Sequence, residues 1–205
     1  TTMENMFNKS NFNQDIGSWD VSKVTNMRRM FANTGAFNQD LNGWDVSNVT
    51  NMEGMFLWAR KFNNNIGNWN TGNVTSMHQM FFSAFVFNND ISGWDTGNVT
   101  NMVNMFRGAS AFDQDIGSWD VSNVTDMEGM LQGTPFNKYI GNWNTGNVTS
   151  MKFMFNGATL FNQDIGGWDV ANVTVFDYMF QHCFSFDQNI TYWTVSSTSS
   201  RRSMF

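Results

Sequence analysis

The chain of 205 residues has little of several things that usually define a soluble domain. It contains one cysteine, Cys183, and one proline, Pro135. A single cysteine excludes an intrachain disulfide, and no Cys/His pair has the spacing of a metal site. Charged residues make up only 14%, below the ~25% usual in soluble domains. The 11 Lys and Arg residues are scattered among 17 Asp and Glu residues, which argues against a nucleic-acid partner because phosphate binding needs a concentrated basic surface.

Long apolar runs are missing as well. No stretch approaches the ~20 residues that span a bilayer, so we expect no membrane span in this segment. The sequence opens with "TTMENMF", already the middle of a repeat, and we interpret the chain as a piece of a longer protein. We predict one repeat domain over residues 1–205, with a partial leading repeat at 1–11 and a degenerate last repeat at 186–205.

Aromatic and apolar residues are plentiful, at 16% and 41%, and they recur with a fixed period. Tryptophans follow one another in steps of 25 residues, with a single step of 24, and a phenylalanine precedes each by seven residues. All 16 methionines lie eight or eleven residues after a Trp position, if Met3 and Met6 belong to a truncated leading repeat. The marker tryptophans are Trp19, Trp44, Trp69, Trp94, Trp119, Trp143, Trp168 and Trp193. Such periodicity indicates a stack of repeats.

Two apolar spacings occur within one repeat. In "IGSWDV", Ile16, Trp19 and Val21 have the LxxLxL arrangement of a leucine-rich-repeat strand. The segment that begins at Val24 continues with Met27, Met30 and Phe31, the face of a short helix or 3₁₀ segment. We therefore predict an α/β repeat solenoid of leucine-rich-repeat type. It would be a right-handed coil of about eight 25-residue turns, with a parallel β-sheet on one face and short helical or 3₁₀ segments on the other.

The repeat motif resembles a known family. "FNQDIGSWDVSKVTNMRRMF" at 12–31 and "FNQDLNGWDVSNVTNMEGMF" at 37–56 are similar to the BspA-type bacterial surface leucine-rich-repeat proteins, whose signature is FNQDIxxWDVSNVTNMxxMF. The resemblance covers eight Trp-centred units, of which the last departs most. It implies a leucine-rich-repeat-like fold displayed outside the cell, on the surface or secreted, and a role in adhesion or binding. It carries no catalytic residue.

Positions that stay the same in every repeat are expected to form the core, so function is expected where the repeats differ. Two neighbouring repeats place large aromatic residues where others have Ala, Asn or Gly, and basic residues lie beside them. The partner-binding candidates are Trp58, Arg60, Lys61, Phe82 and Phe85. This composition is typical of a binding hot spot. The alternative is local packing under the loops.

Acidic and amide residues also recur in columns. The position after each Trp forms a ladder that we expect on the concave face: Asp20, Asp45, Asn70, Asp95, Asp120, Asn144 and Asp169. A second column precedes each predicted strand and includes Asp15, Asp40, Asp90 and Asp115. One interpretation is a hydrogen-bonded ladder that satisfies turn N–H groups. The other is weak binding of Ca²⁺ or a cationic partner; no other cofactor is predicted.

Six "NVT" triplets share one register, with asparagines Asn48, Asn73, Asn98, Asn123, Asn147 and Asn172. In a secreted eukaryotic protein these would accept glycans. The alternative is a hydrogen-bonding role in each repeat, which fits Lys23 at the first of these positions.

The sequence favours a binder over an enzyme. His78 and His182 occupy different columns, and Cys183 has no third group to orient it. We predict an extracellular or cell-surface protein that mediates adhesion by binding protein or glycan on another cell or matrix, or copies of itself. The alternative is a structural subunit of a filament, sheath or surface layer built by end-to-end stacking.

Overall fold

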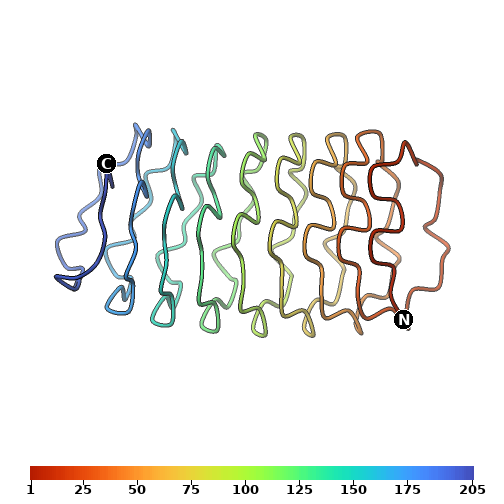
Figure 1. Ribbon diagram of the computed structural model, residues 1–205, viewed down its shortest axis with the longest axis horizontal. Helices are drawn as coiled ribbons and strands as arrows, with labels where there is room; N and C mark the ends of the chain where they lie inside the picture. Colours follow the sequence, from red (N-terminus) through yellow and green to blue (C-terminus); the bar gives the residue numbers. More distant parts are fainter.

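The chain folds as a row of stacked coils. The computed structural model describes all of residues 1–205, and the coils follow one another along one axis from the N-terminus to the C-terminus (Figure 1). Isolated parallel bridges join each coil to the next at the residue that follows "NVT". They run through the whole stack: Thr2↔Asn26, Asn26↔Asn51, Asn51↔Ser76, Ser76↔Asn101, Asn101↔Asp126, Asp126↔Ser150, Ser150↔Val175 and Val175↔Ser200. We name each coil by its tryptophan.

The predicted α/β class is wrong. No residue lies in an α-helix or 3₁₀ helix, and the only β-structure is the single bridge residue of each coil, so no parallel sheet covers a face. All 88 backbone–backbone hydrogen bonds lie outside helices and strands. Consecutive turns make up the coils instead. Without a helix, the structure also contains none that could cross a membrane.

The segment that contains Met27, Met30 and Phe31, which we predicted as a helix, shows why no helix forms. From Met27 onward, alternate N–H groups donate to the next coil and not to the residue four positions back, as a helix requires. These intercoil bonds run from Met27, Arg29, Phe31 and Asn33 to the carbonyls of Asn51, Glu53, Met55 and Leu57. Of the N–H groups between them, Met30 and Ala32 donate three residues back, as from Met30 to Met27 (3.1 Å), and Arg28 donates to the Asn26 side chain (2.9 Å). Half of the backbone N–H groups in this segment thus bond to the next coil, and only single turns form within a coil.

Left-handed residues keep the turns from merging into a helix. Arg29 and Asn33 have φ values of 53° and 58°, and the equivalent positions of every complete coil are also left-handed. Five of these positions are glycine: Gly54, Gly108, Gly129, Gly133 and Gly157. Glycine adopts this conformation without the steric cost that a Cβ imposes. The i, i+3 spacing of the methionines therefore reflects successive turns.

The segment predicted as a strand consists of two tight turns on either side of the tryptophan. Trp19 N–H donates to the Ile16 carbonyl (3.0 Å), and Val24 N–H donates to the Val21 carbonyl (2.9 Å). The side chains of Asp15 and Asp20 support the same turns by accepting the N–H of Gly17 and Ser22. Ile, Trp and Val point inward because of this turn spacing, and not because of strand alternation.

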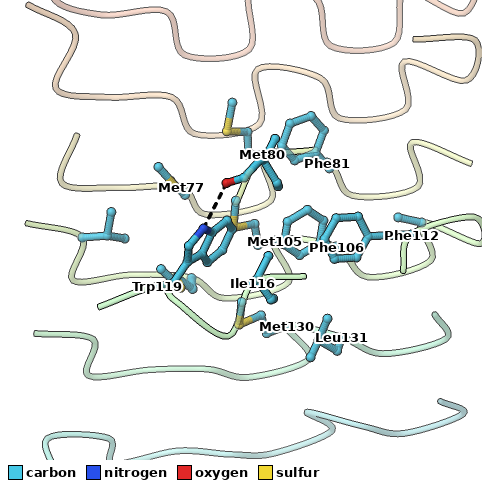
Figure 2. Close-up of a cluster of buried hydrophobic side chains, with 14 of the residues drawn as sticks. Met77, Met80, Phe81, Met105, Phe106, Phe112, Ile116, Trp119, Met130 and Leu131 are labelled. Atoms are coloured by element: carbon cyan, nitrogen blue, oxygen red, sulfur yellow. Dashed lines mark hydrogen bonds between the residues drawn. The ribbon is translucent and has the colours of Figure 1, made fainter. Parts of the chain in front are cut away.

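The prediction that the positions repeated in every coil form the core is confirmed, and their aromatic side chains stack in files from coil to coil. The Phe81 ring centroid lies 5.6 Å from those of both Phe56 and Phe106, and 3.9 Å from that of Phe87. Figure 2 shows Phe81 and Phe106 of successive coils with the methionine column beside them. Fifty-seven buried residues form one continuous core. Each fully buried Phe or Met side chain contributes on the order of 1.5–3 kcal/mol.

The tryptophan file carries its own hydrogen bonds. Trp119 Nε1 donates to the Ile91 carbonyl of the previous coil (3.1 Å), the bond drawn in Figure 2. Every one of the marker tryptophans from Trp44 to Trp193 makes the same bond. Trp94 is 3% exposed, whereas Trp19, which has no preceding tryptophan coil, is 39% exposed. A buried indole N–H is thus always paired, and the pairing fixes the register between coils.

Candidate functional site

Each coil presents one loop between two stacked phenylalanines, except that Leu131 takes the place of the first in the Trp119 coil. In the Trp44 coil the two phenylalanines are Phe56 and Phe62, whose ring centroids lie 3.9 Å apart, and Ala59 is buried between them. Backbone bonds from Ala59 N–H to Phe56 (3.0 Å) and from Phe62 N–H to Ala59 (3.1 Å) close the loop. The other loop residues, Leu57–Trp58 and Arg60–Lys61, are directed outward as a result. We call the row of these loops the loop edge: residues 8–11, 32–36, 57–61, 82–86, 107–111, 132–135, 156–160 and 181–185.

Trp58 is half-buried and stands at a left-handed position, with φ = 58°. Other coils place Lys, Asn, Ser, Gly or His in this column. A left-handed tryptophan costs roughly 1–2 kcal/mol relative to a relaxed backbone. Such strain persists where the surrounding structure enforces it, and it is enriched at functional sites.

The structure brings four of the five partner-binding candidates together. Trp58 N–H donates to the Phe82 carbonyl (2.8 Å), which places the two loops side by side. The Trp58 ring lies 5.7 Å from Phe85, edge to face, and 6.1 Å from Phe82. The Arg60 guanidinium lies over both Trp58 (5.2 Å) and Phe85 (5.9 Å). Lys61 is exposed beside them and contacts none of the rings within cation–π distance. We call these five residues the aromatic–basic cluster.

Sequence reasoning missed residues that the neighbouring coils contribute. Arg107 lies over Phe82 at 5.6 Å and extends the cluster by one coil. On the other side, a cavity of about 470 Å³ beside Trp58 and Arg60 is lined also by Asn11, Asn33 and Gly35. Aligning the repeats by column could have found these residues, because Arg107 stands in the Phe82 column and Asn33 in the Trp58 column.

The aspartate ladder holds turns together. Asp20 Oδ1 accepts the Ser22 N–H (3.0 Å) and the Ser22 hydroxyl (2.6 Å). These bonds, the hydroxyl first, lower the pKa of Asp20 below its usual value. The other members of the ladder each accept the N–H two residues on: Asp45, Asn70, Asp95, Asp120, Asn144 and Asp169. Aspartate and asparagine supply the same acceptor, which explains why the repeats interchange them.

The second acidic column behaves in the same way. Asp90 accepts the Ser92 N–H (2.9 Å), and this bond is the largest cause of its lowered pKa. Asp15, Asp40 and Asp115 make the equivalent bond. Nowhere in the molecule do three Asp, Glu, His or Cys side chains converge as a metal site requires. Each carboxylate serves its own turn.

The asparagines of the "NVT" triplets bond to the preceding coil. Asn98 Nδ2 donates to the Gly72 carbonyl at 2.6 Å, and Asn123 donates to Gly97 at 2.7 Å. The same bond occurs at Asn48, Asn73, Asn147 and Asn172. The side-chain amides therefore help to hold neighbouring coils in register.

The cysteine lies inside the stack. Cys183 is 7% exposed and its Sγ donates to the Ala158 carbonyl at 3.1 Å. Burial raises the pKa of the thiol to about 12. The thiol therefore stays protonated at neutral pH, which disfavours nucleophilic chemistry.

Comparison with known proteins identifies the family of the chain through its repeats. One family model matches it three times, over residues 1–84, 62–135 and 112–205, so that the matches together span the whole chain. Neither a curated protein nor a solved structure matches the chain. The repeated match agrees with the repetition of side-chain columns and intercoil bonds described above. The chain thus belongs to the repeat family described as "Mycoplasma protein of unknown function, DUF285".

Proposed function

We propose that this chain is a non-enzymatic binding module of an extracellular or cell-surface protein, and that its partner docks on the aromatic–basic cluster. The observation that carries the proposal is that Phe82 and Phe85 lie against Trp58 and that Arg60 lies over Trp58 and Phe85, on a surface where most other coils have small or polar residues. Aromatic and arginine side chains dominate binding energy in protein interfaces.

The alternative role of the cluster is packing beneath the loops. Two features argue against it. The buried file of Phe56, Ala59 and Phe62 already closes the loop without help from Trp58. The coils that have Gly at the Trp58 position, with Gly108, Gly133 and Gly157, form the same turns and intercoil bonds.

The resemblance to BspA-type surface proteins supports the proposed location outside the cell and the proposed role in adhesion. It rests on the shared repeat signature, and the family match described above states no function. Partners of the proposed class are proteins or glycans of another cell or of the matrix.

The test is binding of the fluorescently labelled protein to an array of immobilised glycans and extracellular-matrix proteins. The double variant Trp58→Gly, Phe85→Ala should lose the signal and keep its melting temperature, because Gly relieves the left-handed strain at position 58. The matched control is Tyr192→Ala, which removes an aromatic side chain that is 79% exposed and distant in the stack. Equal binding by the double variant and the wild type would contradict the proposal. Assembly of the wild type into fibres, seen by electron microscopy, would favour the filament alternative.

A further inference from the structure

Arg60 is a positioned cation without a partner. Two aromatic rings, Trp58 and Phe85, hold its guanidinium at 5.2 and 5.9 Å. None of its N–H groups donates a side-chain hydrogen bond, and it belongs to none of the ion pairs of the chain. By contrast, Arg28 is paired with both Glu4 (2.9 Å) and Glu53 (3.1 Å). The planar fork of Arg60 is therefore free to bind a carboxylate or sulfate group through two parallel hydrogen bonds.

The charge of the surroundings favours an anion. No Asp or Glu lies anywhere on the loop edge, whereas Lys9, Arg60, Lys61 and Arg107 do. Ten of the 17 acidic residues lie instead in the two aspartate columns, with Asp164 as the tenth, in the second column. The chain carries a net charge of −6, yet this edge carries only cations. An anionic ligand is thus attracted to the loop edge and repelled from the aspartate columns.

The cavity beside Arg60 has a mixed lining. It is an open hollow of about 470 Å³, and its lining, not its volume, distinguishes it from the other hollows of the molecule. Trp58 supplies an aromatic wall, Asn11 and Asn33 supply amides, and Gly35 leaves the space above its Cα open. An indole ring contacts the C–H face of a sugar, and side-chain amides hydrogen-bond to hydroxyl groups.

A peptide ligand fits this surface less well. An extended peptide binds by adding a strand to an exposed sheet edge. Here one backbone N–H of each loop is already bonded to the next coil, as from Trp58 to Phe82 and from Ser83 to Arg107 (both 2.8 Å), and the next N–H along bonds within its own loop, as from Ala59 to Phe56. The cavity is also short, since five residues line it.

We propose that this cavity binds an acidic saccharide, with the sugar ring against Trp58 and its carboxylate or sulfate on Arg60. Asn11 and Asn33 contact the hydroxyl groups. The inference rests on the proposed function, to which it adds the ligand class.

The experiment titrates the full chain with three oligosaccharides by calorimetry: 3′-sialyllactose, a heparin-derived tetrasaccharide, and lactose as the neutral counterpart of the first. Binding of either acidic sugar at least tenfold tighter than lactose is expected, and the arm that binds separates carboxylate from sulfate recognition. Arg60→Gln should weaken that binding at least tenfold, and Arg60→Lys should weaken it less. Arg201→Gln, which removes an exposed cation outside the loop edge, should leave it unchanged.

Three outcomes overturn the inference: no acidic sugar binds, lactose binds equally well, or a poly-glutamate peptide binds equally well with the same dependence on Arg60. The proposed function is tested separately by the array. Loss of array binding in the Trp58→Gly, Phe85→Ala variant, together with any of these outcomes, leaves the binding site standing and rejects only the acidic saccharide. Undiminished array binding in that variant rejects the function itself.

Discussion

Phe81 and Phe82 are adjacent in the chain but belong to two different regions of the molecule. Phe81 is fully buried in a file of rings that recurs in every coil. Phe82 is half-buried on the loop edge, in a column that reads Ala32, Leu57, Phe82, Arg107, Gln132, Asn156 and Gln181. The interior repeats because each coil must cover its neighbours with the same shape. The loop edge has no such constraint, so its residues are free to differ and to recognise a partner.

The largest effect should come from the interior. Phe81→Ala removes a ring in contact with Phe56, Phe87 and Phe106, and we expect a loss of about 3–5 kcal/mol in the free energy of unfolding. Phe82→Ala should cost about 1 kcal/mol or less, because the ring is only partly buried. Urea denaturation followed by tryptophan fluorescence measures both. Equal losses would remove the distinction between the two regions.

A smaller effect should come from the side-chain bonds between coils. Asn98→Ala deletes the amide bond to the Gly72 carbonyl and should cost about 1 kcal/mol. The matched control is Lys23→Ala, because Lys23 occupies the same column and makes no such bond. If the two variants unfold at the same denaturant concentration, the asparagine column does not hold the coils together.

The left-handed columns offer a test in which the sign of the effect changes. Gly157→Ala places a Cβ at φ = 70°, where its nearest neighbour is an ordinary 3.7 Å away, so the expected loss of about 1 kcal/mol comes from the backbone alone. Gln79→Gly, at φ = 56° in the other left-handed column, should stabilise the protein by roughly 0.5–1 kcal/mol. Thermal melts should show a lower melting temperature for Gly157→Ala and a higher one for Gln79→Gly. Shifts of the same sign would mean that turn conformation does not limit stability.

The smallest effect concerns the dependence of stability on pH. Hydrogen bonds from Ser22, Ser47 and Ser122 lower the pKa values of Asp20, Asp45 and Asp120 below the ordinary 3.8. A lowered pKa in the folded state contributes stability that is present above 3.8 and is lost as the pH falls through the folded-state pKa. Stability should therefore decline below pH 3.8. The measurement is the urea midpoint from pH 5 to pH 2, which should fall less steeply in the Ser22→Ala, Ser47→Ala variant; an unchanged slope would contradict this role of the hydroxyl groups.

The interior was predictable from the sequence because period alone identifies it. Trp94, Met105 and Phe106 recur at fixed spacing, and residues that recur in a stack share an environment. The secondary structure was not predictable in the same way. A spacing of i, i+3 is common to a helix and to a run of single turns, so the methionines do not separate the two.

The signal that could have corrected the helix prediction lies in the left-handed column that contains Arg29. Gly54 and Gly129 alternate there with Asn5 and Asn104, and these are the residues that tolerate left-handed φ. Their presence in the middle of the segment argues against a helix, which they destabilise. The predicted cluster of Trp58, Phe82 and Phe85 was visible because it departs from the repeat. Asn33 and Arg107 were missed because they enter the site from neighbouring coils, which only alignment of the repeats by column reveals.

The central claim is that the repeated residues build the stack and the changing loop residues bind the partner. Its most direct test replaces residues 57–61 and 82–86 with the sequence of residues 32–36, Ala-Asn-Thr-Gly-Ala, which already occupies the same columns one coil earlier. Array binding and the melting temperature are measured together on this variant and the wild type. We predict that the melting temperature is retained and that binding is lost. Retained binding, or a variant that fails to fold, would contradict the claim.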